Sequence, residues 1–182
     1  DCTTQRRNQK LIEEESFSIV PEEIIRQCEN SAIKMARHVK YKGVGTAEFL
    51  YSLDNNLVTF LEINPRLQVE HIVTELLLDV NIPVLLYRLT CEKKTLDKLF
   101  LDFPNIMINY ENKHLDIKLP LPSRYVIAAR LNAENPEDNF KPSCGIVRSI
   151  EIPNIPHCWS YTSIMNGGQI LGTVDSQFGH LF

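Results

Sequence analysis

Polar and apolar residues alternate along residues 60–71, and this stretch predicts a β-strand with two unlike faces. The polar positions are Glu62, Asn64, Arg66, Gln68 and Glu70, and the apolar positions between them are Leu61, Ile63, Leu67 and Val69. Alternate side chains of an extended chain share a face. One face would therefore be apolar, and the other would carry two carboxylates, two amides and a guanidinium. Such groups can hold a metal, hold an anion and move a proton.

The alternative interpretation is a half-buried strand whose polar face is only solvated. Asn and Glu are poor strand formers, so their repeated use on one face favours a functional reason. Pro65 cannot donate a hydrogen bond to a β-ladder. We therefore expect the strand to end or kink at Pro65.

A possible partner strand, residues 44–51, precedes this stretch and is joined to it by the turn-prone residues 52–56. If Asp54–Asn56 form a three-residue hairpin loop, paired residue numbers sum to twice 55, and Glu48 lies opposite Glu62. Facing like charges destabilise a sheet, and a cation between them reverses that effect. Carboxylate oxygens together with substrate phosphates are typical magnesium ligands. A slip of one residue would place the two carboxylates on opposite faces.

Helical periodicity dominates the flanking segments of the first half of the chain. Apolar residues at helical spacing predict a helix that begins at Pro21 and continues to Val39. A second helix is expected after Glu70. It ends near Asn81, and Pro83 begins a third helix.

The second half of the chain is expected to be rich in β-structure. Residues 125–131 and 144–150 are candidate strands. Residues 91–122, which are rich in Asn, Lys and Asp, form a mixed connecting region. Trp159 and Tyr161 are expected to be core residues rather than a stacking platform for a ligand.

Composition narrows the class of protein. The chain has 182 residues, of which 43% are hydrophobic, enough for one large domain or two small ones. A net charge of −4 with both signs interspersed argues against a nucleic-acid groove or a basic membrane surface. No stretch approaches the ~20 apolar residues that span a bilayer, and the N-terminus resembles no signal peptide. The first residue is not Met and neither end is a polar tail, so we interpret the chain as a piece of a longer protein.

Two common kinds of site are not indicated by the sequence. The five cysteines are widely spaced without a Cys-x-x-Cys pair, which is typical of reduced thiols in an intracellular protein rather than of a zinc site. The seven glycines form neither a Walker phosphate loop nor a Rossmann fingerprint.

Residues 62–71, Glu-Ile-Asn-Pro-Arg-Leu-Gln-Val-Glu-His, resemble the signature of the biotin carboxylase component of biotin-dependent carboxylases, which have an ATP-grasp fold. The resemblance extends to residues 1–10, 45–49, 130–136 and 140–143, and it is weakest from residue 91 to residue 123. Residues 159–161, 167–168 and 174–180 resemble the large multidomain acetyl-CoA carboxylases of eukaryotes.

This resemblance implies an α+β architecture in three parts. Residues 1–90 would be the C-terminal half of an ATP-grasp lobe, an antiparallel sheet with helices. Residues 91–122 would connect it to residues 123–182, the truncated start of the biotin carboxylase C-terminal subdomain. Such a piece is expected to have little activity by itself, because the glycine-rich lid that excludes water would lie upstream.

The resemblance also implies a reaction. ATP and bicarbonate would form carboxyphosphate, and its carbon dioxide would pass to N1 of biotin on a carrier domain. The cofactors would be ATP, Mg²⁺ or Mn²⁺, and biotin. A carboxyltransferase domain of the same parent chain would then make malonyl-CoA for fatty acid synthesis. No nucleic acid or membrane span is expected, the compartment would be the cytoplasm or a plastid, and a homo-oligomer is left open.

Ten residues receive roles from the resemblance. The metal would be held by Glu48, Glu62 and Asn64, and the nucleotide by Gln5, Lys10, Glu48 and Glu62. Bicarbonate would be held by Arg66, Gln68 and the Val69 backbone. The catalytic residues would be Glu70, Arg66, Arg130 and Lys10. Glu70 would be the general base that deprotonates bicarbonate and later accepts the proton of biotin. Lys10 would neutralise phosphate charge, and Arg130 would stabilise the biotin enolate.

Simpler alternatives exist for several of these residues. Without the resemblance, Arg130 would be a strand residue paired with Glu134, and Lys10 and Arg66 would be ordinary surface cations. Glu48 would be an exposed hairpin residue. His71 is expected to be structural, because the motif already supplies its base.

Three alternatives for the whole chain are kept. One is the biotin carboxylase part of another carboxylase, such as propionyl-CoA or pyruvate carboxylase. Another is a degenerate, non-catalytic homologue, because Asn8 stands where the family usually has His. The third is a different ATP-grasp ligase, which should lack Arg130 and the pair formed by Arg66 and Gln68.

Overall fold

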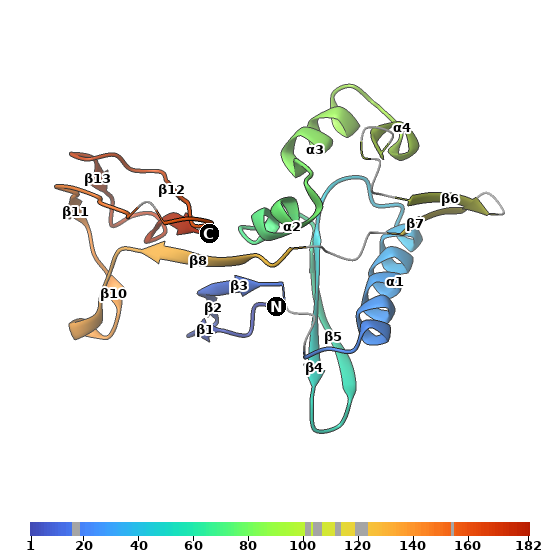
Figure 1. Ribbon diagram of the computed structural model, residues 1–182, viewed down its shortest axis with the longest axis horizontal. Helices are drawn as coiled ribbons and strands as arrows, with labels where there is room; N and C mark the ends of the chain where they lie inside the picture. Colours follow the sequence, from blue (N-terminus) through green and yellow to red (C-terminus); the bar gives the residue numbers. More distant parts are fainter. Residues whose placement is uncertain (16–18, 101–102, 104–106, 112–113, 119–123, 154) are drawn as a thin grey trace. The chain divides into compact units, whose positions relative to one another are not determined.

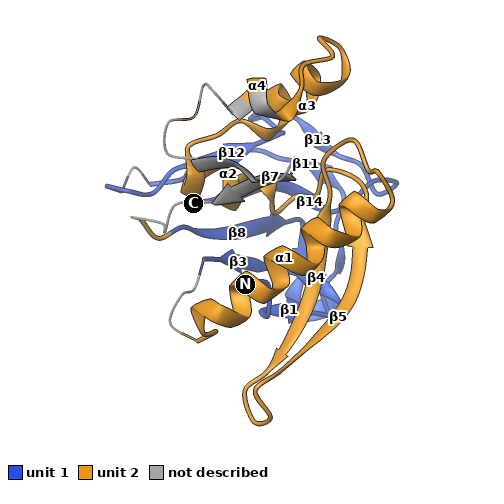
Figure 2. Ribbon diagram, turned by 90° about the vertical axis from the view of Figure 1, so that its right-hand side faces the viewer, with its two compact units in different colours: residues 1–15, 126–182 blue, residues 16–125 orange. Residues whose placement is uncertain are grey.

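The computed structural model describes residues 1–15, 19–100, 103, 107–111, 114–118, 124–153 and 155–182. The chain forms two compact units (Figure 1 and Figure 2): unit 1 is Asp1–Glu15 with Val126–Phe182, and unit 2 is Ser16–Tyr125. Among the described residues, all strand pairs are antiparallel and the α-helices belong to unit 2. The expected α+β class with antiparallel sheets is confirmed.

Unit 2 combines two hairpins with four helices in its described part. Its elements are α1 (Glu22–His38), β4 (Thr46–Ser52), β5 (Leu57–Asn64), α2 (His71–Leu78), α3 (Ile82–Thr90), α4 (Leu96–Phe100), β6 (Met107–Glu111) and β7 (His114–Lys118). Strand β4 pairs with β5, and β6 pairs with β7. The segment expected to be only a mixed connection therefore contains α4 and the β6–β7 hairpin.

The helix starts follow the local signals in the sequence. Helix α1 has Pro21 at its N-cap, Glu22 and Glu23 in its first turn, and Arg37 and His38 in its last turn. This distribution of charge complements the helix dipole. The helix expected from Pro21 is confirmed.

Helices α2 and α3 are separated by a short break. The break contains Asp79 in the left-handed conformation, at φ 56°. The Asn81 side chain then caps α3 by accepting a hydrogen bond from the Val84 backbone N–H at 2.8 Å. An Asn cap followed by a proline in the first turn is a strong helix start. The two helices expected on either side of Asn81 are therefore confirmed.

Unit 1 is built around a four-stranded sheet in the order β12-β14-β8-β3. Its described elements are β1 (Gln5–Arg6), β2 (Gln9–Lys10), β3 (Ile12–Glu14), β8 (Ile127–Asn132), β9 (Glu134–Asn135), the 3₁₀ helix η1 (Pro136–Asp138), β10 (Lys141–Pro142), β11 (Gly145–Ile146), β12 (Ser160–Thr162), β13 (Gln169–Ile170) and β14 (Gln177–Leu181). Strand β3 comes from the N-terminal segment and pairs with β8. The sheet therefore joins the two ends of the chain.

The interior of unit 1 contains ionisable groups beside apolar ones. Val126 and Ala128 are buried, and so are Glu13, Ser176 and His180. A buried charge is costly unless it is paired. The partner of Glu13 is therefore a structural requirement of this sheet.

The strand expected over residues 144–150 is largely replaced by irregular chain. Only β11 is regular, and it pairs with β13. Beyond it, the Val147 N–H donates to the Gly168 carbonyl at 2.8 Å, and the Ile150 N–H donates to the Asn166 side chain at 2.7 Å. These backbone groups are satisfied by a neighbouring loop, so the ladder is not continued.

The expectation that Trp159 and Tyr161 are core residues is wrong. Their exposed fractions are 47% and 58%. Trp159 stacks on Phe182 with a centroid distance of 4.2 Å. Tyr161 lies on β12, one of the two edge strands of the sheet, and pairs with His180 of β14.

The three-part division expected from the sequence stays a prediction. The compact units place residues 1–15 with the C-terminal segment, because β3 pairs with β8 and the Glu15 N–H donates to the Val126 carbonyl. The expected boundaries at residues 90 and 122 concern evolutionary domains.

Candidate functional site

Glu48 and Glu62 are directly opposed on β4 and β5. The expected pairing is confirmed, but the loop length and the register that produce it differ from those expected. The loop is Leu53–Asn56, four residues rather than three, so Phe49 pairs with Phe60 and paired numbers sum to twice 54.5. A register shift between Glu48 and Phe49 then restores the pairing of Glu48 with Glu62.

Leu61 lies between the two register partners Phe60 and Glu62, so it is the extra residue of a β-bulge. A bulge re-aims the side chains that follow it. Without this extra residue, the alternation of the strand would direct Glu62 to the face opposite Glu48. The bulge therefore permits two carboxylates to meet.

Asn64 links these two carboxylates. Its amide nitrogen donates to Glu62 Oε1 at 2.8 Å and to Glu48 Oε1 at 3.2 Å. Glu48 is half-buried and Glu62 is exposed. An N–H group that points at two carboxylate oxygens partly offsets their repulsion.

The donor set fits a hard divalent cation. Two carboxylates and an amide oxygen are groups that magnesium accepts alongside phosphate oxygens, and the amide can present its oxygen after a flip about the terminal bond. No cluster of three or more His, Cys, Asp or Glu with the spacing of a metal site occurs in the described part of the chain. A metal here would therefore depend on these three side chains together with ligands from a nucleotide.

Strand β5 ends at Asn64, directly before Pro65, as expected. Residues 65–70 are irregular, and the Arg66 N–H turns back to the Asn64 carbonyl at 2.8 Å. The alternation of polar and apolar faces expected for residues 60–71 therefore does not continue as a strand beyond Pro65. Arg66, Gln68 and Glu70 instead lie on a loop that leads into α2.

Gln68 connects this loop to the carboxylate pair. Its side chain is only 9% exposed, and Nε2 lies 3.5 Å from Glu48 Oε1. Its Oε1 is buried and has no hydrogen-bond partner among the described residues. A buried unsatisfied acceptor is costly and needs an explanation. A ligand that donates a hydrogen bond would satisfy it.

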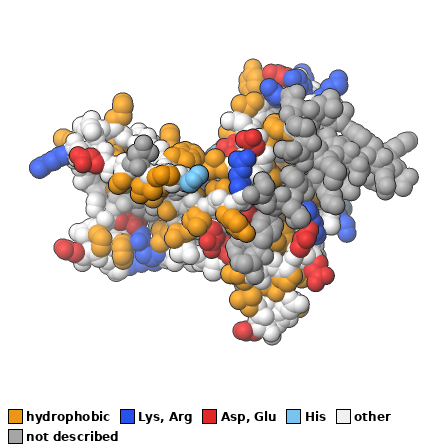
Figure 3. All heavy atoms as spheres, in the orientation of Figure 1, with side chains coloured by type: hydrophobic (Ala, Val, Ile, Leu, Met, Phe, Trp, Pro, Cys, Tyr) orange, Lys and Arg blue, Asp and Glu red, His pale blue; other side chains and the backbone are white. Residues whose placement is uncertain are grey.

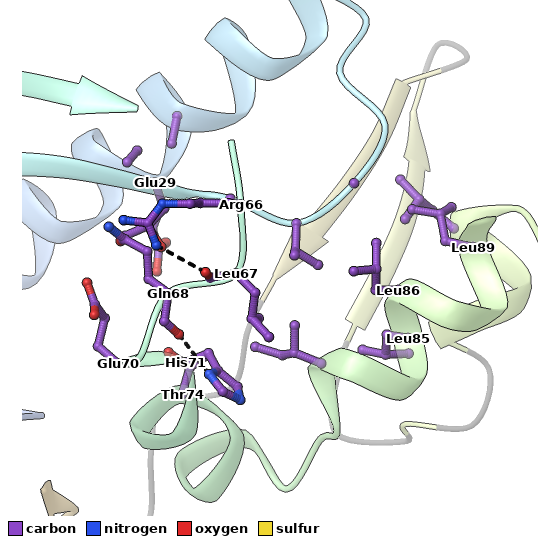
Figure 4. A pocket seen from close by; sticks show the side chains of 18 of the residues that line it. Glu29, Arg66, Leu67, Gln68, Glu70, His71, Thr74, Leu85, Leu86 and Leu89 are labelled. Atoms are coloured by element: carbon purple, nitrogen blue, oxygen red, sulfur yellow. Dashed lines mark hydrogen bonds between the residues drawn. The ribbon is translucent and has the colours of Figure 1, made fainter. Parts of the chain in front are cut away.

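Arg66, Gln68 and Glu70 line one side of a cavity of about 600 Å³, which Figure 4 shows from close by. The exposed Arg66 guanidinium reaches the Leu67 carbonyl at 3.3 Å. Glu70 is half-buried and is the N-cap residue of α2. A guanidinium and a carboxylate on one short loop can bind a small anion and exchange a proton with it.

The opposite side of the cavity is apolar, with leucine side chains from α3 such as Leu85, Leu86 and Leu89. Cys28 of α1 also lines it. Burial, followed by the nearby Glu29 charge, raises the pKa of the Cys28 thiol. All five cysteines are free thiols, in agreement with the sequence-based expectation.

His71 contacts the backbone of the same loop. Its Nδ1 lies 2.7 Å from the Gln68 carbonyl, and its Nε2 lies 3.7 Å from a Glu75 carboxylate oxygen. The His71 N–H also donates to the Gln68 carbonyl. These contacts hold the first turn of α2 against the loop, which supports the expected structural role.

Gln5 and Lys10 lie in unit 1 and are register partners in the β1–β2 hairpin. Arg7 and Asn8 form its turn at φ 51° and φ 65°. Asn tolerates this left-handed conformation well. The departure from the usual His is therefore compatible with the backbone at this position.

Arg6, which was not expected from the sequence, anchors this hairpin. Its guanidinium pairs with the Glu134 carboxylate and lies 3.9 Å from the centroid of the Phe140 ring. The Glu134 carboxylate also accepts from the Ser176 hydroxyl at 3.2 Å. Gln5 and Arg6 are neighbours on a short strand, so their side chains point to opposite faces. This was the local signal that Arg6 would not share the position of Gln5.

Arg130 of β8 forms an ion pair with Glu13 of β3, with Nε 2.5 Å from Oε1. The pairing with Glu134 that was considered from the sequence is replaced by two separate pairs, because Glu134 binds Arg6. Glu13 was also missed. Its signal was weak, because it is the first of three consecutive glutamates and nothing local marks it as buried.

Two known protein families match consecutive parts of this chain. Residues 1–97 match the family described as carbamoyl-phosphate synthase L chain, ATP binding domain, and residues 128–182 match the biotin carboxylase C-terminal domain. The chain belongs to the biotin carboxylases. The family expected from residues 62–71 is thus confirmed.

Similar proteins include acetyl-CoA carboxylases. The chain is 37% identical to acetyl-CoA carboxylase dmxL1 of Cryptosporiopsis sp. and 36% identical to acetyl-CoA carboxylase 2 of Arabidopsis thaliana. Both comparisons cover all of this chain and 8% of the relative. The chain therefore spans a small part of the length of these relatives.

Solved structures of carboxylases share the fold. One similar structure is a single-chain, multi-domain long-chain acyl-CoA carboxylase, with a TM-score of 0.84 at 28% identity over all of this chain and 18% of that one. Another is the biotin carboxylase domain dimer of Hydrogenobacter thermophilus 2-oxoglutarate carboxylase in complex with MgADP, ADP and bicarbonate. Its TM-score is 0.79 at 27% identity, over all of this chain and 36% of that one. In the described part of this biotin carboxylase chain, no helix is long and apolar enough to cross a bilayer.

Proposed function

We propose that this chain contributes to the biotin carboxylase half-reaction of an acetyl-CoA carboxylase, in which ATP and bicarbonate carboxylate carrier-bound biotin. The opposed pair Glu48 and Glu62, linked through Asn64, is the observation that carries the proposal. Identity to acetyl-CoA carboxylases across the whole chain supports this choice of carboxylase. The reaction class is that of an ATP-dependent ligase.

Glu48, Glu62 and Asn64 would hold magnesium or manganese. The ion supplies charge neutralisation at the phosphates of ATP. Gln68 would help to hold Glu48 in this arrangement, because its amide nitrogen donates a hydrogen bond to Glu48 Oε1. Gln5 and Lys10 would contact the nucleotide, and the Lys10 ammonium would offset the negative charge that develops on the transferred phosphoryl group.

Bicarbonate would lie against Arg66, Gln68 and the Val69 backbone. A planar guanidinium suits a planar anion through paired hydrogen bonds, and a Gln68 amide N–H would donate to another bicarbonate oxygen, which leaves the bicarbonate proton for Glu70. Glu70 would remove the bicarbonate proton, which leaves an oxygen lone pair to attack the γ-phosphorus as ADP departs. The same carboxylate, after release of that proton, would accept the N1 proton of biotin.

Arg130 would stabilise the biotin enolate through charge-assisted hydrogen bonds to its oxygen. Biotin, when bound, would supply the nitrogen nucleophile that takes up carbon dioxide, and the breakdown of carboxyphosphate into phosphate and carbon dioxide would provide that carbon dioxide. A carrier domain bearing biotin and a carboxyltransferase domain would belong to the full-length protein, as the multidomain relatives suggest. The proposal includes an intracellular location, in the cytoplasm or a plastid, supported by the plant relatives.

The test uses the full-length protein and compares acetyl-CoA, propionyl-CoA and pyruvate as acceptors. Malonyl-CoA formation that requires ATP, bicarbonate and biotinylated carrier supports the proposal. Preference for propionyl-CoA or pyruvate would instead favour another carboxylase of the same family. Absence of bicarbonate-dependent ATP cleavage with all three acceptors would identify a non-catalytic homologue.

A further inference from the structure

Glu13 is the most deeply buried charged residue among those described in unit 1. It is 1% exposed, although it lies on the short strand β3 near the N-terminus. One carboxylate oxygen accepts the Arg130 Nε–H at 2.5 Å, and the other is buried without a hydrogen-bond partner among the described residues. A carboxylate held this far from water depends on its pair for its charge.

The register of the sheet explains how the two side chains meet. Glu13 is the register partner of Ala128, and Arg130 lies two residues further along β8, on the same face as Ala128. Glu13 and Arg130 are therefore a diagonal cross-strand pair. Ala128, the register partner of Glu13, is buried and carries only a methyl group on that face.

Strand β3 also holds the backbone of Arg130. The Arg130 N–H donates to the Leu11 carbonyl at 2.9 Å, one residue before β3 begins. The N-terminal segment thus binds Arg130 at its main chain and at its side chain. A guanidinium is planar, so a short bond at Nε sets the plane in which the two Nη nitrogens lie.

We propose that Glu13 is a positioning residue for the biotin step: its carboxylate sets the orientation in which the Arg130 guanidinium meets the biotin oxygen. This inference rests on the proposed function, in which Arg130 stabilises the enolate. Orientation is the property that matters, because a misplacement of about 1 Å can cost ~10²-fold in rate. Residues that orient metal ligands typically contribute ~10–100-fold to activity, and we expect an effect of similar size for a residue that orients a catalytic guanidinium.

The principal variant is Glu13→Asp in the full-length protein, assayed with free biotin. Aspartate keeps the charge but shortens the side chain by one methylene, which draws the guanidinium out of place. We expect kcat for biotin carboxylation to fall by about 10–100-fold, with the KM for ATP unchanged. Bicarbonate-dependent ATP cleavage without biotin is the internal reference, because a general folding defect would lower both rates together.

Two further variants make the test specific. Glu13→Gln keeps the length and the acceptor oxygen, so it should retain more biotin carboxylation than Glu13→Asp does. A larger loss in Glu13→Gln than in Glu13→Asp would show that charge rather than position matters, and would overturn the proposal. Glu14→Asp on the same strand makes the same chemical change on the opposite face and should match the wild type.

Arg130→Lys separates this inference from the proposed function. If Arg130→Lys leaves biotin carboxylation intact, the proposed role of Arg130 fails. If Arg130→Lys is impaired and Glu13→Asp is not, only the inference about Glu13 fails. Should Glu13→Asp not fold, Glu13→Gln carries the test: in an Arg130→Lys background its added cost should vanish, and full additivity would overturn the proposal.

Discussion

Glu48 and Glu62 face each other across the β4–β5 hairpin only because Leu61 interrupts the register between them. The Asn64 amide donates to both carboxylates and joins them into one polar cluster. Two like charges at facing positions are unfavourable in a sheet without a compensating group. The repulsion between the two carboxylates thus lowers the stability of the hairpin, and a bound cation would turn it into a favourable interaction.

Glu62→Gln should have opposite effects without and with a metal nucleotide. Without one, removal of a facing charge should leave stability unchanged or raise it, by up to about 1 kcal/mol. With ATP and Mg²⁺, the variant should gain less thermal stability than the wild type, because a ligand that binds only the folded state stabilises it in proportion to its affinity. Thermal unfolding of the full-length protein with and without ATP and Mg²⁺ measures both effects.

Asp54→Asn is the matched control, because it removes one negative charge from the exposed loop of the same hairpin. It should respond to ATP and Mg²⁺ as the wild type does. If ATP and Mg²⁺ raise the thermal stability of Glu62→Gln as much as that of the wild type, Glu62 is not a metal ligand.

Glu70→Gln should abolish most bicarbonate-dependent ATP cleavage and leave ATP binding nearly intact. The amide cannot accept the bicarbonate proton, and loss of one catalytic proton transfer typically costs ~10²–10⁴-fold. Initial rates of ADP release, measured beside equilibrium binding of ATP, separate the two properties. Asp79→Asn at the end of α2 makes a similar charge change and should be silent, because asparagine also tolerates its left-handed conformation. Wild-type turnover in Glu70→Gln would exclude Glu70 as the base.

Arg6→Ala should destabilise unit 1 by about 1–3 kcal/mol, because it leaves the poorly exposed Glu134 carboxylate without its ion pair and removes the contact with Phe140. Chemical denaturation followed by a probe in unit 1 measures this change. Lys141→Ala breaks an exposed pair with Asp138 and should cost less than about 1 kcal/mol. Equal costs for the two variants would show that the Arg6 contacts contribute no more than a surface pair.

Cys28 should react with iodoacetamide more slowly than the exposed Cys91. Burial and the neighbouring Glu29 raise the pKa of the Cys28 thiol, so less of the reactive thiolate is present at a given pH. Labelling of Cys28, followed by mass spectrometry across a pH series, should begin at a higher pH than for an unperturbed thiol. Equal labelling of both cysteines at every pH would contradict this prediction.

The raised pKa of Cys28 also makes the free energy of unfolding depend on pH. A raised pKa means that the folded state holds the thiol proton more tightly than the unfolded chain does. The associated stability is fully present below the thiol pKa of the unfolded chain, and it is lost as the pH rises through the folded pKa. Cys28→Ser should reduce this alkaline loss.

The sequence alone determined the local elements and the family signature that continues into the loop after β5. Pro21, Asn81 and Pro65 act through their own backbone and capping preferences, so the helix starts and the strand end could be read directly. The family signature at residues 62–71 likewise depends only on residue identity and spacing. Such signals operate within a few residues and need no partner elsewhere in the chain.

Tertiary structure decided what depends on distant partners. The sequence-based register placed Glu48 opposite Glu62 through the wrong loop, since a bulge at Leu61 is set by packing along the whole hairpin. The pair formed by Glu13 and Arg130 joins residues 117 positions apart, and nothing near Glu13 in the chain indicates its burial. Long-range strand pairing determines which of several similar carboxylates is removed from water, because burial is a property of the assembled sheet.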